Sequence, residues 1–409
     1  MLLAPEQDNA LKSVDTWLRD KSADPVFRLF GFAGTGKTTL ARHFAEGLGD
    51  RVLFAAYTGK AAHVLRSKGC SGASTIHSLI YHTKEKGGAR LRDLEQSLVD
   101  LMQQLRSEGM VDTQINEHKR VHDLKKLIED ERKSLSRPTF TLNPDSVVKD
   151  AKLVIIDECS MVDSRMGEDL LSFGTKVLVL GDPAQLPPVM GGGFFTEGKP
   201  PNVMLTDIHR QAKDNPIIAM ATKVRNQESL SLGNYGDSSV VDKIEPTEAT
   251  AADQILVGKN ATRHSSNRRV RTLRNIVEPY PIAGDKLVCL RNNHDKGLLN
   301  GAIWYVDDVG DRDDERIRMT LSPEDGDPPL DVEAHMHHFI GKGDSLPWWE
   351  RKEAEEFDYG YALTVHKSQG SQWDNVLLFD ESHVFRDDRW KWLYTGITRA
   401  AKSIKIARL

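Results

Sequence analysis

The sequence lacks the features of a membrane or secreted protein. It has only three cysteines, far apart and without disulfide or zinc-ligand spacing, so we expect Cys70, Cys159 and Cys289 to be packing residues. No run approaches the roughly 20 apolar residues that span a bilayer. The N-terminal stretch "MLLAPEQDNALKSVD" carries acids where a signal peptide would carry basic charge. The default expectation is a cytoplasmic protein with no membrane contact.

Internal repeats and a strong charge of either sign are also missing. The formal net charge of −5 leaves a nucleic-acid partner open, because a binding groove can be basic on an acidic protein. A chain of 409 residues exceeds what one hydrophobic core supports, so two or more domains are expected.

Short β-branched runs recur along the chain, and several are followed by helix-length segments. This alternation is typical of parallel sheets covered on both faces, hence of an α/β fold. Polar residues at the carboxyl ends of such strands face one crevice, where ligands bind. The runs are "VFRLF" from residue 26, "RVLFAAY" from 51, "KLVIIDE" from 152, "KVLVLGD" from 176, "QILVGKN" from 254, "DNVLLFD" from 374 and "SIKIARL" from 403.

Two segments break this pattern. From about Lys84 to Arg137 the sequence is charged and leucines recur at alternating three and four spacing, which predicts a helix, and the spacing returns after a break. We expect an antiparallel helical hairpin, with either a purely structural role or a further use that periodicity does not define. The apolar positions are Leu91, Leu94, Leu98, Leu101 and Leu105, then Val121, Leu124 and Ile128.

The second break runs from about Asn293 to Asp358. Short alternating strands separated by "NG", "GDRDD" and "PEDGDPP" predict a small β-barrel or meander. Adjacent Trp348 and Trp349 near its end either stack on bases or pack under the barrel, and packing is favoured because large aromatics mostly contribute apolar burial.

Residues 31 to 40, "GFAGTGKTTL", match a phosphate-binding loop. Gly31, four further residues, Gly36, Lys37 and Thr38 have the P-loop spacing, between a predicted strand and a predicted helix. The glycines let backbone amides curl round phosphates, Lys37 reaches the β- and γ-phosphates, and the Thr38 hydroxyl is placed to bind Mg²⁺. A chance glycine-rich turn is the alternative, and both flanks weigh against it.

Two later strand ends support a nucleotide site. Asp157 follows a buried run and can bind Mg²⁺ directly or through water, which leaves Glu158 to orient or deprotonate the attacking water. Gln185, shortly after "KVLVLGD", carries an amide that suits sensing of the γ-phosphate and its water. Each residue alone is a weak signal, and together they favour an NTPase.

The ordered motifs resemble superfamily 1B helicases, in particular the phage Dda and RecD-like branch. The matches cover most of the chain outside the two breaks, and "TVHKSQG" followed by "YTGITRA" is highly specific. The resemblance implies two RecA-like domains with parallel sheets, ATP in the cleft between them and a nucleic-acid strand across their tops. The matching stretches are "GFAGTGKTTL", "AYTGKAAHVLR", "STIHSLI", "VIIDECSMVD", "LGDPAQLPPV", "LTDIHRQ", "YALTVHKSQGSQWDNV" and "LYTGITRA".

A division into four parts follows from this resemblance, with the second break read as an SH3-like β insertion. The parts are the first RecA-like domain at 1–83 and 138–200, a helical insertion at 84–137, the second RecA-like domain at 201–292 and 359–409, and the β insertion at 293–358.

The resemblance also assigns nucleotide contacts. Gln7 would read the adenine, and Arg210 and Arg399 would reach the γ-phosphate from the second domain, so that hydrolysis requires a closed cleft. The branch commonly has an acid, a candidate ribose contact, where this chain has Gln372, which puts nucleotide selectivity in question. The other nucleotide contacts are Gly34, Gly36, Thr39 and Gly370.

Strand contacts are assigned to hydroxyl, imidazole and ammonium groups on loops. Such groups bind phosphates and position a strand without reading its sequence, and their binding weakens as salt rises. The two histidines have an alternative as structural residues. The contacts are Thr58, Lys60, His77, Thr364, His366 and Lys367.

The expected activity is that of an ATP-dependent DNA helicase moving 5′ to 3′ on single-stranded DNA. Polarity and the choice of DNA come from the resemblance. A translocase without efficient unwinding is the main alternative, since the separating element is either the helical hairpin, the "PTFTLN" stretch near Phe140, or neither. Expected partners are single-stranded DNA and DNA forks, with a single-strand-binding protein or replication and repair proteins; a monomer in a bacterial or phage-infected cell is expected.

Other functions fit less well. A small-molecule kinase or switch GTPase has no use for "HKSQG" and would need an acceptor site or a guanine motif. A nonenzymatic clamp that uses ATP as a structural ligand is disfavoured by Glu158 and the two arginines. No nuclease carboxylate cluster stands out in the sequence.

Overall fold

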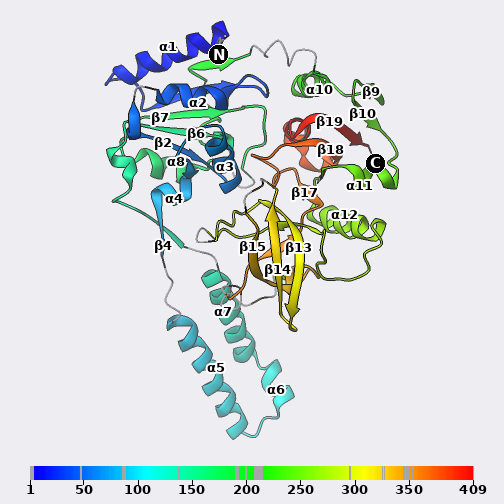
Figure 1. The fold of residues 1–409 in the computed structure, drawn as a ribbon. Helices are drawn as coiled ribbons and strands as arrows, with labels where there is room; N and C mark the ends of the chain where they lie inside the picture. The colour runs from blue at the N-terminus through cyan, green and yellow to red at the C-terminus, as the bar shows by residue number, and fades with distance from the viewer. Residues whose placement is uncertain are drawn as a thin grey trace.

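The structure is a computed structural model whose described residues form two mainly parallel sheets, each accompanied by helices, one five-stranded antiparallel sheet and one two-stranded antiparallel sheet (Figure 1). The residues that it describes are 4–46, 48–84, 89–136, 139–188, 193–198, 200–206, 215–293, 296–324, 326, 328–343, 346, 351 and 353–408.

The first sheet has six parallel strands made mostly of buried apolar residues, as expected where both faces are covered. In spatial order they are β3 (Ser74–Thr75), β2 (Val52–Ala56), β6 (Leu153–Asp157), β7 (Val177–Gly181), β1 (Val26–Gly31) and β8 (Val203–Leu205). The helices around it are α1 (Pro5–Arg19), α2 (Lys37–Ala45), α3 (Gly59–Ser67), α4 (Ile76–Ile80) and α8 (Ser164–Leu171).

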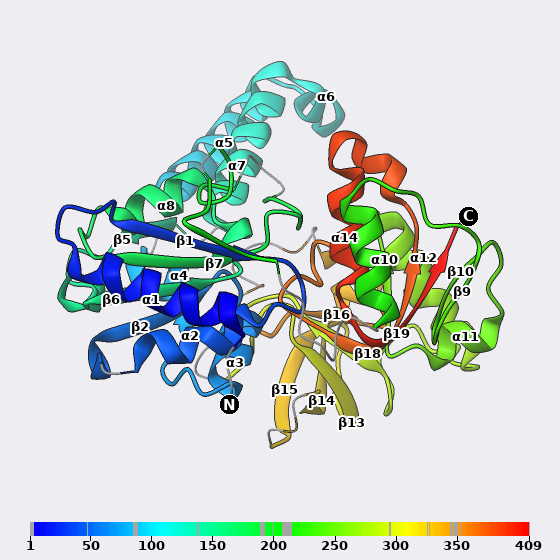
Figure 2. The same ribbon diagram turned by 90° about the horizontal axis from the view of Figure 1, so that it is seen from above.

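The second sheet also has six strands, and only its edge strand β9 runs antiparallel. In spatial order they are β17 (Ala362–Thr364), β11 (Gln254–Val257), β18 (Trp373–Phe379), β19 (Ala400–Ala407), β10 (Ser238–Val241) and β9 (Gly233–Tyr235). Its helices are α10 (Pro216–Arg225), α11 (Pro246–Ala251), α12 (Asn260–Leu273) and α14 (Arg389–Ile397). Figure 2 shows α10 and α14 side by side, and they pack against each other.

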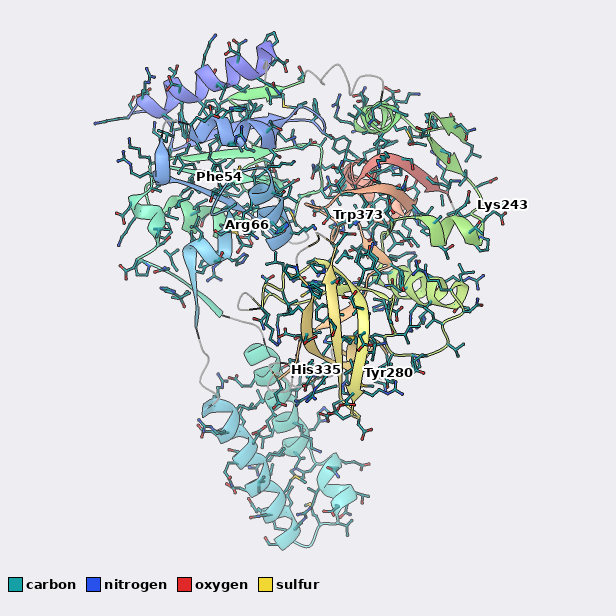
Figure 3. All side chains as sticks on the ribbon, in the orientation of Figure 1. Phe54, Arg66, Lys243, Tyr280, His335 and Trp373 are labelled. Atoms are coloured by element: carbon teal, nitrogen blue, oxygen red, sulfur yellow. The ribbon has the colours of Figure 1, made fainter. Side chains whose placement is uncertain are left out.

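The third sheet is antiparallel and lies against the second, where it is yellow in Figure 1. Trp373, labelled in Figure 3, donates its indole N–H to Glu324 over 3.0 Å and so joins the two sheets. Residues of both sheets share one apolar core. In spatial order the strands are β15 (Leu330–His335), β14 (Arg316–Pro323), β13 (Ile303–Arg312), β12 (Lys286–Cys289) and β16 (Phe357–Tyr359).

Three helices, α5 (Ala89–Ser107), α6 (Asp112–Glu117) and α7 (Lys119–Ser136), project away from the parallel sheets (Figure 1). They have a small apolar core of their own, and a two-stranded antiparallel sheet of β4 (Tyr81–Lys84) and β5 (Thr139–Leu142) lies at their base. Short 3₁₀ helices complete the fold: η1 (Gly49–Arg51), η2 (Val147–Asp150), η3 (Cys159–Met161), η4 (Met336–His338) and η6 (Ser382–Asp388).

These findings confirm the predicted α/β class. All seven apolar runs form strands, and both leucine-type stripes lie on helices, although the expected hairpin contains the extra short helix α6. Cys70, Cys159 and Cys289 are free and buried, as expected for packing residues. Within the described ranges no helix is long and apolar enough to cross a membrane.

The division into four parts stays a prediction, and the sheets cross several of its boundaries. β8 pairs with β1 beyond residue 200, because the chain returns to the first sheet before it enters the second. β12 and β16 pair with each other and extend the antiparallel sheet outside 293–358. Trp348 and Trp349 lie outside the described residues.

Candidate active site and strand interface

The P-loop connects the end of β1 to the start of α2. Gly34 and Gly36 have φ of +82° and +81°, in the left-handed region that glycine adopts without strain. Gly36 is the N-cap of α2 and offers no side chain to the first amides of the helix. A helix N-terminus with free amides is suited to phosphate binding, so this loop fits the triphosphate of a nucleotide.

The Lys37 side chain is folded onto its own loop. Its ammonium donates hydrogen bonds to the carbonyl oxygens of Gly31, at 2.6 Å, and Phe32, at 3.1 Å. The phosphate oxygens of a nucleotide would compete with these carbonyls for the ammonium. Thr39, on the first turn of α2, is exposed.

Thr38 and Asp157 meet across the sheet. The Thr38 hydroxyl donates to a carboxylate oxygen of Asp157 over 2.8 Å, and the other oxygen accepts the backbone N–H of Glu158 over 2.9 Å. In the described residues no group of three His, Cys, Asp or Glu side chains could hold a metal alone. A hydroxyl beside one carboxylate instead fits Mg²⁺, which usually keeps water and phosphate oxygens as its other ligands.

Glu158 combines an unusual backbone with an unusual titration. Its φ of +54° is rare for a residue with a side chain and is typical of functional sites. Burial raises the pKa of its carboxyl, and the neighbouring Asp157 raises it further, while Arg399 and Lys37 oppose the shift. A carboxylate with a raised pKa is better suited to accept a proton from water.

Gln185 is 7% exposed and lies in the turn after β7, where its backbone N–H donates to the Asp182 carbonyl over 3.1 Å. Its side-chain oxygen has no hydrogen-bond partner among the residues that the structure describes. A buried unpaired amide oxygen calls for a water or ligand partner, which agrees with the predicted sensing role.

Arg399 belongs to the second sheet's side of the site and is 6% exposed. Its guanidinium donates to the carbonyls of Thr395, at 3.1 Å, and Ser371, at 3.2 Å, and to the Thr398 hydroxyl, at 3.1 Å. It is close enough to Glu158 to oppose the rise in the pKa of that group. Arg210, the second predicted arginine, lies outside the described residues.

The two parallel sheets also meet through hydrogen bonds that the sequence analysis missed. The Tyr394 hydroxyl donates to Asp182 over 2.6 Å and accepts the P-loop N–H of Ala33 over 3.1 Å. The N–H of Leu186 donates to Thr395 over 3.0 Å. Tyr394 and Thr395 lie in "LYTGITRA" and Asp182 in "LGDPAQLPPV", so the motifs were recognised but the contact between them was not.

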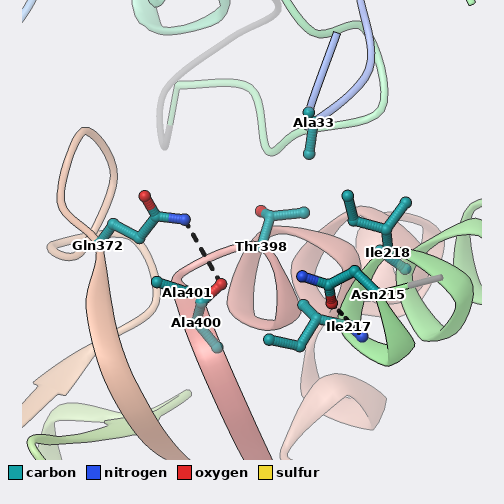
Figure 4. A pocket seen from close by; sticks show the side chains of 10 residues that line it. Ala33, Asn215, Ile217, Ile218, Gln372, Thr398, Ala400 and Ala401 are labelled. Carbon is teal, nitrogen blue, oxygen red and sulfur yellow. Dashed lines mark hydrogen bonds between the residues drawn. The ribbon is translucent and has the colours of Figure 1, made fainter. Parts of the chain in front are cut away.

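A small cavity of about 110 Å³ lies between the P-loop and the second sheet (Figure 4). Ala33 faces it from the P-loop, and Gln372 and Thr398 line the opposite side. The Gln372 amide donates to the Ala400 carbonyl over 3.4 Å. Gln372 is therefore placed between the sheets, where the resemblance expects a nucleotide contact.

Gln7 is buried on α1 and contacts the P-loop directly. Its amide N–H donates to the carbonyl of Thr35 over 3.1 Å, and its side-chain oxygen accepts the N–H of Ala4 over 3.0 Å. The predicted adenine reader is thus attached to the phosphate loop.

Predicted contacts from both sheets meet at the N-terminus of α3, where the strand candidate Thr58 lies beside the nucleotide candidate Gly370. Thr58 caps this helix, accepting the N–H of Ala61 over 3.1 Å, and Lys60 is 8% exposed. Gly370, with φ of +79°, packs so closely that a Cβ there would lie 3.0 Å from the Ala61 Cβ and 3.3 Å from the Thr58 hydroxyl. The loop that follows β17 therefore lies directly against α3, and only glycine fits at this contact.

The two predicted strand histidines are partly buried against aromatic rings. His77 lies between Tyr57 and Tyr81, with ring centroids 6.0 and 5.7 Å apart, and His366 lies 5.3 Å from Phe385. Burial lowers the pKa of both imidazoles. The lowered pKa favours the neutral imidazole, which would contact a strand by hydrogen bonding or stacking.

The remaining strand candidates follow β17. The hydroxyl of Thr364 accepts the N–H of Lys367 over 3.3 Å, and the Lys367 ammonium donates to the side-chain oxygen of Asn300. Asn300 comes from the segment that leads into the antiparallel sheet, so that sheet lies beside the predicted strand path.

The comparisons with known proteins agree with this geometry. A family model described as an AAA domain matches residues 2–246, and one described as a UvrD-like helicase C-terminal domain matches residues 359–405. The ATP-dependent RecD2 DNA helicase of Deinococcus radiodurans is 26% identical, over 91% of this chain and 45% of its own length. The ATP-dependent DNA helicase Pif1 of Campylobacter jejuni is 24% identical, over 62% of this chain and 68% of its own.

Solved Pif1 structures share the fold. The Bacteroides Pif1 helicase in complex with ADP-AlF3 and single-stranded DNA has a TM-score of 0.55 at 18% identity, over 99% of this chain and 92% of its own. The Candida albicans Pif1 helicase has a TM-score of 0.53 at 18% identity, over 100% and 95%.

The chain spans less than half of the RecD2 relative's length. The AAA-domain match nevertheless covers more than half of this chain, and the helicase C-terminal match covers the end of the second sheet. Together with the ordered motifs, these matches show that the chain belongs to the superfamily 1B helicases, in their RecD/Dda-like branch.

Proposed function

We propose that the chain is an ATP-dependent DNA helicase that moves 5′ to 3′ along single-stranded DNA and unwinds duplex. The observation that carries the proposal is the position of Arg399, which follows α14 and is bonded to Thr395, the residue that also accepts a hydrogen bond from Leu186 beside the first sheet. The preceding residue of that helix, Tyr394, is bonded to the P-loop and to Asp182. A guanidinium supplied across a cleft stabilises charge on the transferring phosphoryl group only when the cleft is closed. Hydrolysis and relative movement of the sheets are then linked.

The ATP site would use residues from both sides of the cleft. Gln7 would contact the adenine, Lys37 the phosphates, and Thr38 with Asp157 a Mg²⁺ ion. When bound, Mg²⁺ neutralises charge on the phosphates. Glu158 would orient the attacking water and accept its proton. The remaining residues that we assign to the ATP site are Gly34, Gly36, Thr39, Gln185, Gly370, Gln372, Arg210 and Arg399.

The strand would cross the meeting point of α3 and the loop after β17. The closeness of Gly370 to Thr58 supports this path, because Gly370 lies in the same loop as the candidate strand contacts His366 and Lys367 and brings that loop against α3. Structures described as Bacteroides Pif1 bound to single-stranded DNA, and as two Pif1 helicases at forked double-stranded DNA, support single strands and forks as substrates here. The contacts would be Thr58, Lys60, His77, Thr364, His366 and Lys367.

We further propose a monomer that acts in the cytoplasm of a bacterium or a phage-infected cell, in DNA replication or repair, with a single-strand-binding protein as a partner. The RecD2 and Pif1 relatives, both described as DNA helicases, support this setting.

The test is strand separation on matched duplexes with a 5′ tail, a 3′ tail or no tail, in the presence of ATP and Mg²⁺. Unwinding of the 5′-tailed duplex alone, lost in Lys37→Ala, is expected. If single strands stimulate ATP hydrolysis but no duplex opens, the protein is a translocase instead. That outcome would mean that neither candidate separates strands, neither the helical hairpin, which forms three helices, nor the "PTFTLN" stretch, which forms one strand of a two-stranded sheet.

A further inference from the structure

A cation–π contact joins the second sheet's helices to the P-loop. The guanidinium carbon of Arg225 lies 3.5 Å from the centroid of the Phe32 ring. Phe32 is the second residue of the P-loop and Arg225 the last residue of α10, and both are half-buried. The distance is well inside the range of about 6 Å in which such contacts are attractive.

The contact is the main feature that holds the Arg225 side chain. Within the described ranges its guanidinium makes no hydrogen bond or ion pair, although it has five N–H donors. The buried Arg271, in contrast, is held by the Asp285 carboxylate at 3.1 Å, and the buried Arg399 by two carbonyls and a hydroxyl. The last turn of α10 favours a cation through the helix dipole, yet this does not require the side chain to lie on a ring of the opposite sheet.

The backbone of Phe32 is hydrogen-bonded to Lys37 and Thr35 in the P-loop. Its carbonyl oxygen accepts three hydrogen bonds: from the Lys37 ammonium at 3.1 Å, from the Thr35 hydroxyl at 2.9 Å and from the Thr35 N–H at 3.3 Å. The next residue, Ala33, donates its N–H to Tyr394 of α14. Two consecutive P-loop residues are thus held by α10 and α14, which pack on each other (Figure 2).

We propose that Arg225 is a positioning residue for ATP hydrolysis. With α10 against the P-loop, its guanidinium fixes the Phe32 ring and thereby the carbonyl that shares the Lys37 ammonium with a nucleotide. When the sheets separate, the contact is lost and this part of the loop is released. The inference deepens the proposed function and rests on it, since it concerns the same ATP site.

The test is a double-mutant cycle in single-strand-stimulated ATP hydrolysis by the full chain. Arg225→Ala and Phe32→Ala should each lower kcat by about fivefold to tenfold, the size of one partly desolvated cation–π contact. The KM for ATP should change less than kcat, because the contact acts on the closed state. The double variant should be no slower than the slower single variant.

Conservative and control variants separate positioning from folding. Phe32→Tyr keeps the ring and should restore kcat, and Arg225→Lys keeps the charge without the planar stack and should lie between wild type and Arg225→Ala. The matched control is Arg389→Ala, which removes a cation–π contact to Trp390 at 4.6 Å within α14 and should leave kcat unchanged. Thermal unfolding of each variant detects loss of structure.

Additive effects in the double variant, or wild-type kcat in a folded Arg225→Ala protein, would overturn the inference. If the alanine variants fail to fold, the conservative variants test the inference. A folded Phe32→Tyr protein with a kcat well below that of wild type, or a folded Arg225→Lys protein with the kcat of wild type, would also overturn it. If the wild-type protein hydrolyses ATP but does not unwind duplex, the proposed helicase activity is wrong, and the role of Arg225 in ATP hydrolysis can still be tested. Wild-type protein that does not hydrolyse ATP removes both proposals.

Discussion

The hydroxyl of Tyr394 donates a 2.6 Å hydrogen bond to the carboxylate of Asp182, 212 positions earlier in the chain. One residue lies on α14 beside the second sheet and the other directly after β7 of the first. The same hydroxyl accepts the N–H of Ala33 in the P-loop. Hydrogen bonds to a carboxylate are stronger than neutral ones, so the two sheets are firmly joined beside the P-loop.

Tyr394→Phe should destabilise the protein and slow ATP hydrolysis. The change removes the Tyr394 partner from one oxygen of the buried Asp182 carboxylate, whose other oxygen still accepts the Ala184 N–H, and it removes the acceptor of the Ala33 N–H. Leaving a buried polar group unsatisfied typically costs about 1–3 kcal/mol in free energy of unfolding. The P-loop also loses its hydrogen bond to α14. Denaturant unfolding gives the stability, and steady-state ATP hydrolysis gives kcat.

The control for this prediction is Tyr235→Phe. That hydroxyl donates over 2.9 Å to the Ser231 carbonyl in an exposed hydrogen bond, so water can replace the lost partner. A Tyr394→Phe protein as stable and active as Tyr235→Phe would show that the junction tolerates the loss.

Asp157→Asn should raise the Mg²⁺ concentration that ATP hydrolysis requires. The carboxylate that touches the Thr38 hydroxyl becomes neutral, and hard cations bind neutral amides less well than carboxylates. The half-saturating Mg²⁺ concentration should rise by at least about tenfold, and chelation with EDTA should abolish activity in wild type. Asp145→Asn, at an exposed acid that pairs with Lys149, serves as the control. An unchanged Mg²⁺ dependence in Asp157→Asn would remove this residue from the metal site.

The rate of ATP hydrolysis should fall as the pH is lowered, and this fall should begin at a higher pH than it would if the base were a glutamate with an ordinary pKa. Burial raises the pKa of Glu158 above 4.5, and only the deprotonated form can accept a proton from water. This fall should appear on the acidic side of a pH profile of kcat/KM. Glu158→Gln should lower kcat by about 10²- to 10⁴-fold. A flat profile down to pH 5 would argue against Glu158 as the base.

The same pKa predicts a stability change of defined sign. Because the folded state holds the Glu158 proton more tightly than the unfolded state, stability due to this group is present below 4.5 and is lost as pH rises toward the folded pKa. Glu158→Gln should therefore stabilise the protein near pH 7 and reduce the pH dependence of unfolding above pH 4.5. Thermal unfolding of both proteins across this range measures the difference.

Local patterns carried most of the fold prediction. Apolar runs such as Val177–Gly181 must be buried on both faces, and the leucine stripe of α5 follows helical spacing, so strand and helix could be assigned from neighbouring residues. The P-loop was identified in the same way, because its glycines, lysine and threonine are consecutive in the sequence.

Contacts between distant residues could not be predicted. Nothing near Tyr394 in the sequence shows that its hydroxyl reaches Asp182. In the sequence Arg225 is an ordinary arginine at the end of a helix, and only the structure shows that its guanidinium lies on the Phe32 ring. The edge strand β8 was missed as part of the first sheet because it has only three residues. Such features depend on how the sheets are placed relative to each other, which spacing does not encode.

Removal of the projecting helices should leave ATP hydrolysis intact. Their apolar residues, among them Leu105 and Ile115, form a core separate from those of the sheets, and β4 and β5 are already adjacent at their base. Residues 85–138 can therefore be replaced by a short Gly/Ser turn. Strand-stimulated hydrolysis should persist, and comparison of unwinding with that of wild type shows whether α5–α7 take part in strand separation. Loss of both hydrolysis and folding would show that the helices are structurally required.

Lys367→Ala should weaken strand binding and reduce its dependence on salt. The ammonium is held by Asn300 beside the meeting point of the two sheets, and a phosphate would compete with that amide oxygen for it. Loss of one phosphate contact should lower the slope of log K against log salt by about 0.7 for a single strand. The control is Lys402→Ala, at an exposed lysine that pairs with Asp374 at 2.7 Å and lies on β19. Fluorescence anisotropy of a labelled single strand across a salt series measures both slopes. If the Lys367→Ala slope equals that of Lys402→Ala, the Lys367 ammonium does not contact the strand and instead holds the antiparallel sheet in place. A purely structural contact can change the affinity for DNA, but its loss leaves the number of released counterions, and therefore the slope, unchanged.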